Sequence, residues 1–251
     1  MKRKKSAIKL STAILAVLML LVVTGVFASM ITLKGVYDKR DKSDLYWNYN
    51  KILQTPYKYL KINGGNVTNI VFEQSKNSSV RLLNYWNPDT GMVKAYVKQD
   101  TLYLTFKNKY DNLGMKYWMQ REVLVRLFAP QLLSVEGSDT NFELQKMQQG
   151  NFNINLKGRS RLEVETYKRN MDSLRVMQSD SSQVIFEVSP DLRGSQTMHF
   201  KYVDATMAGT TLLDVGRSFA EKTKLDLSDS SAVILSGKSL RSMPVLSARQ
   251  K

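Results

Sequence analysis

From Tyr57 onward, short apolar or alternating segments are separated by polar turns, and this pattern predicts β-strands throughout. Clusters of Gly, Asn, Asp and Ser lie between the segments, as is typical of tight turns. Residues 216–224, GRSFAEKTK, indicate a short helix instead. The strand-like segments are YLKI, NIVF, VRLL, MVKAYV, TLYLTF, EVLVRLF, FNINL, RLEVE, SLRV, QVIFEV and AVIL.

One phrase occurs twice, as SDSSQVIF at 179–186 and SDSSAVIL at 228–235. It belongs to a series of polar turns that recur at spacings of 22, 21, 29 and 20 residues. A period near 21 residues is typical of solenoid repeats. We interpret SPDLRGSQT, in the long interval, as an insertion in one coil. The turns are marked by Ser138, Ser160, Ser181, Thr210 and Ser230.

Each repeat is expected to form one turn of a wound β-sheet, with the next turn stacked about 4.8 Å away. Because side chains alternate along a strand, every second residue then faces the core. Small polar residues are expected at the corners. The inward residues are expected to be Val135, Phe142, Leu144, Ile154, Leu156, Leu162, Val164, Leu174, Val176, Val184, Phe186, Val188, Leu225, Leu227, Val233 and Leu235.

The Ser-Asp pairs are interpreted as corners rather than as catalytic groups. A nucleophilic serine needs a base within reach, and the sequence contains one histidine, His199, which we interpret as a partly buried strand-end residue. Asp139, Asp180 and Asp229 could stack as acids of a polysaccharide-cleaving site, but Ser and Thr surround them. We therefore predict no catalytic residues and a non-catalytic module for binding, adhesion or structure. The alternative is a β-helical enzyme acting on acidic polysaccharide.

An uncharged run from Leu10 to Leu33 is long enough, as a helix, to cross a membrane. The preceding MKRKKSAIK is basic, which places residues 1–9 in the cytoplasm as a basic tail and the rest of the chain outside. The alternative is a signal peptide cleaved after Ala28. A retained anchor over residues 10–33 is favoured, because apolar residues continue beyond that point.

The remaining chain is divided by composition into three parts. Residues 34–56 are charged and aromatic without clear periodicity, and are interpreted as a juxtamembrane linker. Residues 57–240 form the predicted β-solenoid domain. Residues 241–251 form a basic C-terminal tail.

The chain has 37 basic and 22 acidic residues, a formal net charge of +15. Without the five cations of the N-terminal tail the net charge is +10. Because the cations are interspersed with acids and accompany no nucleic-acid motif, we expect the partners to be anionic polysaccharide or lipid headgroups, and no nucleic acid. With no cysteine and one histidine, the sequence predicts no metal site and no cofactor.

Every tryptophan follows a tyrosine, and two of these pairs lie in loop-like sequence. Flat aromatic rings near cations suit sugar faces or membrane interfaces. The alternative is that the rings cover an open end of the solenoid. The candidate ligand surface consists of Tyr85, Trp86, Tyr117 and Trp118.

The stretch YLKINGGNVTNIVFEQSKNSSVRLL, followed by TLYLTF and the SDSS-type repeats, resembles the bacterial head GIN domain family. This family is named for auto-transporter adhesins of Bacteroidetes-type bacteria, and the resemblance spans about residues 57–240. It implies a single-stranded, right-handed β-helix outside the cytoplasmic membrane, without catalytic residues. The apolar run and its basic flank predict that this body is anchored in the bacterial inner membrane by a single pass, with its C-terminal domain in the periplasm. The chain departs from the family in having fewer Gly-Ser-Gly corners.

Overall fold

A computed structural model describes residues 10–39, 43–66, 69–84, 93–107, 123–166, 170–188, 198–216 and 218–235. The chain divides into two compact units, Met1–Trp47 and Asn48–Lys251. The first unit contains one helix, and the second contains all the described strands.

Helix α1 runs from Leu10 to Asp38 and is exposed along its whole length. Its hydroxyl groups are satisfied internally, because Thr24, Ser29 and Thr32 donate to carbonyls one turn earlier. By length and composition this helix could cross a membrane, and a signal sequence would have the same properties. The helix continues five residues past Leu33, the predicted end of the anchor. A drop in hydropathy predicts where an apolar stretch ends, but the backbone hydrogen bonds of a helix can continue into polar residues.

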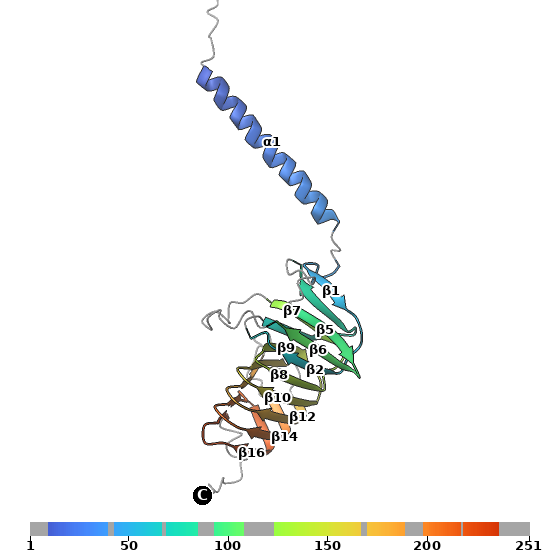
Figure 1. Cartoon of the computed structure of the whole chain (residues 1–251), viewed down its shortest axis with the longest axis vertical. Helices are drawn as coiled ribbons and strands as arrows, with labels where there is room; N and C mark the ends of the chain where they lie inside the picture. The colour runs from blue at the N-terminus through green and yellow to red at the C-terminus, as the bar shows by residue number, and fades with distance from the viewer. Residues whose placement is uncertain are drawn as a thin grey trace, which may run out of the picture. The chain divides into compact units, whose positions relative to one another are not determined.

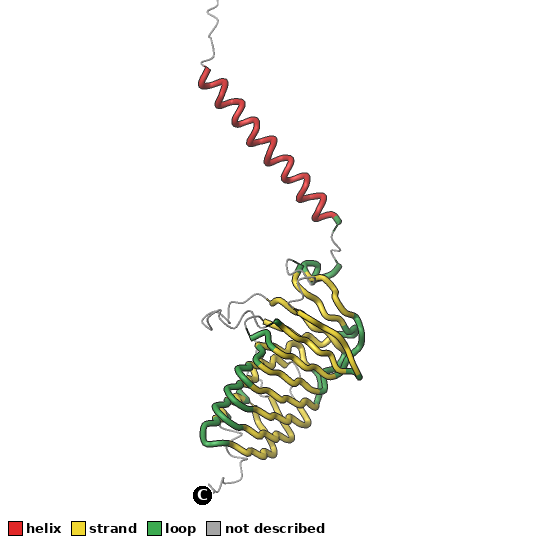
Figure 2. The backbone as a smooth tube through the Cα atoms, viewed as in Figure 1, coloured by secondary structure: helices red, strands yellow, loops and turns green. Residues whose placement is uncertain are grey.

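The β-rich unit is built from two sheets (Figures 1 and 2). A nine-stranded sheet A has the order β1-β4-β7-β3-β9-β11-β13-β15-β17, and an eight-stranded sheet B has the order β16-β14-β12-β10-β8-β2-β6-β5. The strands are β1 (Tyr49–Leu53), β2 (Tyr59–Asn63), β3 (Asn69–Gln74), β4 (Ser79–Leu83), β5 (Val93–Lys98), β6 (Thr101–Phe106), β7 (Val123–Ala129), β8 (Ser134–Ser138), β9 (Asn141–Met147), β10 (Asn151–Lys157), β11 (Arg161–Thr166), β12 (Asn170–Gln178), β13 (Gln183–Val188), β14 (Met198–Met207), β15 (Leu212–Asp214), β16 (Ser218–Leu227) and β17 (Ala232–Ile234).

From β8 onward, successive strands alternate between the two sheets, and each strand pairs in parallel with the strand two places later. The chain therefore returns to the same sheet once per repeat, which explains the period near 21 residues. Figure 2 shows these strands as successive rungs joined by short loops. The expectation of an all-β body is confirmed for the described residues.

The first part of the β-rich unit is arranged differently from the predicted uniform coil. Strands β1 and β4, β4 and β7, and β5 and β6 pair in antiparallel fashion. Strands β2 and β3 lie inside the sheets, next to β8 and β9 respectively. Both sheets are therefore mixed. The alternation of side chains identifies which residues face inward but carries no information on strand direction, so the sequence pattern did not distinguish the two arrangements.

Two segments differ from the sequence-based expectation. Residues 49–53, within the expected linker, form β1, and Tyr49 Oη donates a hydrogen bond of 2.7 Å to the carbonyl of Val123. Residues 216–224, expected to be helical, lie mostly in β16. Ala, Glu and Lys favour helix, but β16 pairs with β14 from Ser218 to Leu227, and this pairing overrides local propensity.

The core lies between the two sheets and follows the predicted alternation. Every predicted inward residue from Val135 to Phe186 is buried. The side chain of Val188 lies outside the described residues. In the last turn, Leu225, Val233 and Leu235 are partly buried and Leu227 is 39% exposed, because no later strand among the described residues covers them. The assignment of Leu227 to the core is wrong.

Candidate functional site

Five of the corners that follow sheet B strands share one backbone conformation. Gly64, Asp139, Gly158, Asp180 and Gly209 all have positive φ, between 52° and 83°. The residue two positions before each corner lies in a strand, and these five strand residues pair with one another from strand to strand in a continuous row. The five corners are therefore stacked. Glycine tolerates positive φ, and aspartate adopts it more readily than most residues. This requirement explains why Gly and Asp recur in the turns.

The corner aspartates bind the backbone of neighbouring turns. Asp139 Oδ1 accepts a hydrogen bond of 3.0 Å from the N–H of Arg159, and Asp180 Oδ2 accepts one of 2.8 Å from the N–H of Gly158. The Gly158 N–H, and then the Ser179 hydroxyl, lower the pKa of Asp180. These hydrogen bonds give both carboxylates a structural role.

A second column of residues carries hydroxyl groups on the inner side of the corners. Ser182 and Ser231 are the last serines of the two repeated phrases, and both occupy this column. The Thr211 and Ser231 hydroxyls are 2.9 Å apart, and the Thr140 N–H donates to Ser160 Oγ over 3.3 Å. The repeated phrase therefore encodes a corner, as predicted. The members of the column are Thr140, Ser160, Ser182, Thr211 and Ser231.

His199 lies away from these serines, near the start of β14. Its Nε2 is 3.0 Å from Glu221 Oε1, and its ring stacks on Phe219 with 5.3 Å between centroids. The side chain is partly exposed. The interpretation of His199 as a partly buried residue at a strand end is confirmed.

The predicted ligand surface of Tyr85, Trp86, Tyr117 and Trp118 lies outside the described residues. The ends of the two segments that contain them can nevertheless be placed. One segment ends where β5 begins at Val93, and the other begins just after β6 ends at Phe106. Val93 pairs with Phe106 in sheet B.

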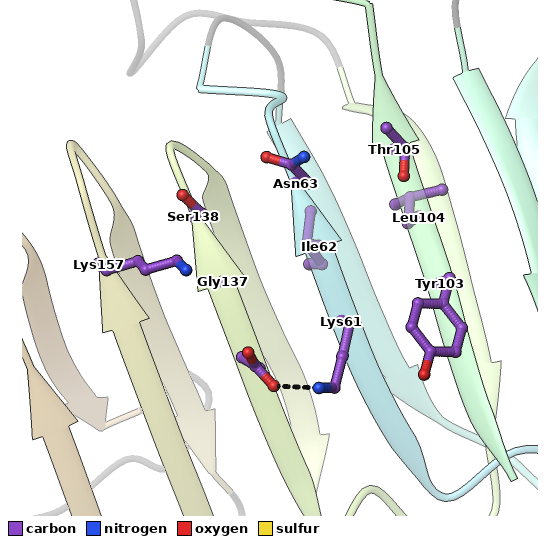
Figure 3. A pocket seen from close by; sticks show the side chains of 10 residues that line it. Lys61, Ile62, Asn63, Tyr103, Leu104, Thr105, Gly137, Ser138 and Lys157 are labelled. Atoms are coloured by element: carbon purple, nitrogen blue, oxygen red, sulfur yellow. Dashed lines mark ion pairs between the residues drawn. The ribbon is translucent and has the colours of Figure 1, made fainter. Parts of the chain in front are cut away.

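A trough crosses the outer face of sheet B near its edge strand β5 (Figure 3). One wall consists of Tyr103, Lys61 and Glu136, which are neighbours across β6, β2 and β8. The volume of the trough is about 310 Å³, at the small end of the range for small-molecule sites. The opposite wall consists of Thr105, Asn63, Ser138 and Lys157, on β6, β2, β8 and β10.

Strand alternation produces the two walls. The residues between them, among which are Leu104 and Ile62, face the core, so their backbone forms the floor. Gly137 also faces inward, where a Cβ atom would lie 2.8 Å from both Leu156 Cδ2 and Thr140 Cγ2. The trough is therefore formed by regular strands that are held in register by the core.

The charges around the trough are mostly positive. Lys61 Nζ lies 2.7 Å from Glu136 Oε2, and this hydrogen bond raises the pKa of Lys61. Lys94, in line with the second wall on β5, and Lys157 form no ion pair with the described residues. The charge of Lys157 does contribute to lowering the pKa of Asp180.

Three tyrosines lie beside the trough and form what we call the tyrosine face: Tyr59, Tyr96 and Tyr103. Tyr96 and Tyr103 are directly opposite on β5 and β6, and their rings stack with centroids 5.0 Å apart and planes 7° apart. Tyr96 is 51% exposed and Tyr59 is 39% exposed. Lys98, next to this face on β5, forms no ion pair among the described residues.

Sequence reasoning missed the trough and the tyrosine face. The tyrosines alternate with apolar residues inside strand-like segments, so they match the ordinary strand pattern. Strands β5 and β6 follow each other along the chain, but the position of the trough and of Tyr59 depends on the pairing of β2 with β6 and β8, which are remote from it in sequence. Within the described residues, no group of three or more His, Asp or Glu side chains could hold a metal ion.

Comparison with known proteins gives no family assignment. No family model matches the chain, and no curated protein matches it. Among solved structures, a protein from Bacteroides fragilis named "putative adhesin" is 13% identical, with a TM-score of 0.33 over 74% of this chain and 95% of the other. A "putative lipid binding protein" from Parabacteroides distasonis is 12% identical, with a TM-score of 0.32 over 74% and 95%.

A "putative cell adhesion protein" from Clostridium sporogenes is 9% identical, with a TM-score of 0.34 over 72% of this chain and 98% of the other. These names indicate adhesins and lipid-binding proteins, and two of the three sources are Bacteroidetes. At such identities and TM-scores the likeness carries no argument about this chain. The proposals below therefore rest on its own residues.

Proposed function

We propose that this chain is a membrane-anchored, non-catalytic binding module that presents the trough and the tyrosine face to an anionic polymer of the cell envelope. The observation that carries the proposal is the arrangement of Lys94, Lys98 and Lys157 on the same sheet face as the three exposed or partly exposed tyrosines. Cations that form no ion pair with the described residues attract anions over long range, while aromatic rings provide contact at short range.

We also propose that residues 134–235 form a single-stranded β-helix. The parallel pairing of alternate strands supports this interpretation. A right-handed winding is expected, since connections between parallel strands of one sheet are almost always right-handed. The resemblance to the head GIN domain family would then include the winding, although this chain has fewer Gly-Ser-Gly corners.

The anchor is proposed to be α1, with the β-rich unit in the periplasm. The apolar length of the helix and the basic residues before Leu10 support this orientation. The alternative, release into the periplasm after signal cleavage, leaves the same β-rich unit on the same side of the membrane. Both alternatives place the trough where envelope polymers occur.

The absence of catalysis is proposed from the roles of the acids. Asp139 and Asp180 bind backbone N–H groups, and Glu136, an acid that lines the trough, is paired with Lys61. Hydrolysis of a glycan by two carboxylates needs one acid that can donate a proton and a second acid at a fixed distance. Neither the corners nor the trough provides such a pair among the described residues.

Binding by the full-length chain in nanodiscs of zwitterionic lipid tests the proposal. We expect the chain to retain polygalacturonate, an acidic polysaccharide, and not dextran, a neutral one. The chain should release polygalacturonate as the salt concentration rises from about 0.05 to about 0.5 M, because the Debye length then falls below the distance between the charges. The double variant Lys94→Gln/Lys98→Gln should bind more weakly. Binding of both polymers alike, or of neither, would refute the proposal.

Aromatic contributions are measured in the same assay. Tyr96→Ala, and separately Trp86→Ala or Trp118→Ala, should weaken binding without lowering the melting temperature by more than a few degrees. If the tryptophan variants instead lower the melting temperature and leave binding unchanged, those residues cap the fold. A preference for anionic vesicles over polysaccharide would identify lipid headgroups as the ligand.

A further inference from the structure

We infer that the ligand is an acidic oligosaccharide segment that lies across the strands of sheet B, with anionic groups at Lys94 and at Lys157. The inference rests on the proposed function and specifies the orientation, the minimum length and the contact residues of the ligand. Its basis is a row of side chains that continues the second wall of the trough to the edge strand β5.

The row is continuous in register. Lys94 pairs with Thr105, Thr105 with Asn63, Asn63 with Ser138, and Ser138 with Lys157. These five residues belong to the adjacent strands β5, β6, β2, β8 and β10. Four strand spacings separate the two lysines, a distance of about 19 Å at about 4.8 Å per strand.

The groups between the two lysines are neutral and can both donate and accept hydrogen bonds. Thr105 and Ser138 offer hydroxyls, and Asn63 offers an amide. On the facing wall, the Glu136 carboxylate accepts hydrogen bonds, and the Tyr103 ring closes the trough on the β6 side (Figure 3). Sugar hydroxyls need donors and acceptors at intervals along a chain, and both walls provide them.

The chemistry of the row distinguishes this ligand from other anions. A lipid headgroup is compact and could reach one lysine but not both. An acidic polysaccharide carries both carboxylates, which can lie at the two lysines, and sugar hydroxyls, which can exchange hydrogen bonds with the neutral polar groups between them.

The minimum length follows from the same distance. A digalacturonate is shorter than the separation of the two lysines, whereas a hexagalacturonate exceeds it. Simultaneous engagement of two sites by one ligand should raise its affinity on the order of tenfold or more over a ligand that reaches one site. Length dependence is therefore the property that distinguishes crosswise binding from simple attraction to a basic surface.

The experiment measures the affinity of the full-length chain in zwitterionic nanodiscs for digalacturonate, hexagalacturonate and neutral maltohexaose by calorimetry. Lys94→Gln and Lys157→Gln should each weaken hexagalacturonate binding about two- to fivefold, as expected for exposed ion pairs. The matched control is Lys224→Gln, because Lys224 is an exposed lysine on the outer face of the same sheet, on the far strand β16. Melting curves check that each variant is folded.

The expected result is strong preference for the hexamer, loss of part of that preference in either trough variant, and no change in the Lys224→Gln control. Equal affinity for dimer and hexamer, or an equal loss in the control, would overturn crosswise binding while leaving the proposed function intact. Failure to bind any acidic glycan, or tighter binding to phosphatidylglycerol vesicles that neither trough variant weakens, would overturn both.

Discussion

The carboxylate of Asp180 accepts a hydrogen bond from the backbone N–H of Gly158, which lies 22 residues earlier and one turn away. Because this contact stabilises the charged form, it lowers the pKa of Asp180 below the reference value of 3.8. A carboxyl group with a lower pKa in the folded state stabilises the fold above its unfolded pKa. This contribution is lost as the pH falls through the folded pKa.

Replacement of this carboxylate should therefore change the acid side of the stability profile. We expect Asp180→Asn to melt at a lower temperature than wild type at pH 6. This difference in melting temperature should become smaller as the pH falls below about 3.8. The control is Asp229→Asn, at the equivalent corner of the second repeated phrase, where no hydrogen bond to the carboxylate occurs in the described part of the chain. Equal effects of both variants would contradict the assignment.

The stacked core should not tolerate a charge. Val184 is fully buried and lies in one column of sheet A with Leu213 and Val233. Val184→Asp should abolish cooperative melting, because a buried, unpaired carboxylate costs several kcal/mol against a total stability of about 5–15 kcal/mol. Val233→Asp should be milder, since Val233 is only partly buried. Ser181→Ala, at an exposed corner, should change the melting temperature little.

The glycine corners should be sensitive to a single methyl group. Gly209 has a φ of +78°, and a Cβ atom there would lie 2.7 Å from the backbone oxygen of Asp180. Gly209→Ala should lower the free energy of unfolding by about 1–3 kcal/mol, through both backbone strain and this contact. The exposed neighbour variant Thr210→Ala is the control in the same denaturant titration. A Gly209→Ala protein as stable as wild type would refute the stacked-corner geometry.

The retained anchor is tested by fractionation. We expect the full-length chain in the membrane pellet after alkaline extraction. The β-rich unit should become accessible to protease only after the outer membrane is permeabilised. N-terminal sequencing of the mature chain provides the decisive measurement. Recovery of a soluble protein that begins at Ser29 would establish signal cleavage in place of anchoring.

The sequence predicted those features that depend on neighbouring residues along the chain. Alternation identified Phe142, Leu162 and Val184 as inward residues, because burial on one face of a strand has a period of two. The polar clusters identified the corners, because a turn needs Gly, Asp or Ser within a few residues. Both signals are local, and the structure confirms both.

Features that depend on remote pairing were not predictable in this way. The trough needs Lys61 beside Glu136, and these residues are brought together by a register between β2 and β8. No pattern within either segment encodes that register. The same limitation explains why β16 was expected to be helical. Pairing with β14, on the side opposite β12, determined the conformation of these residues more strongly than their helix propensity did.

The stacked corners also determine how such a body can change in size. Ser160 and Ser182 occupy equivalent places in successive turns, so removal of residues 160–181 would join Arg159 to Ser182 and leave Gly158 beside Asp139. Removal of part of a turn from within the strands would shift their register and turn core side chains toward solvent. Evolution or engineering can therefore add or remove strands only by whole turns, whereas the loops between strands can differ in length, as in the interval of 29 residues.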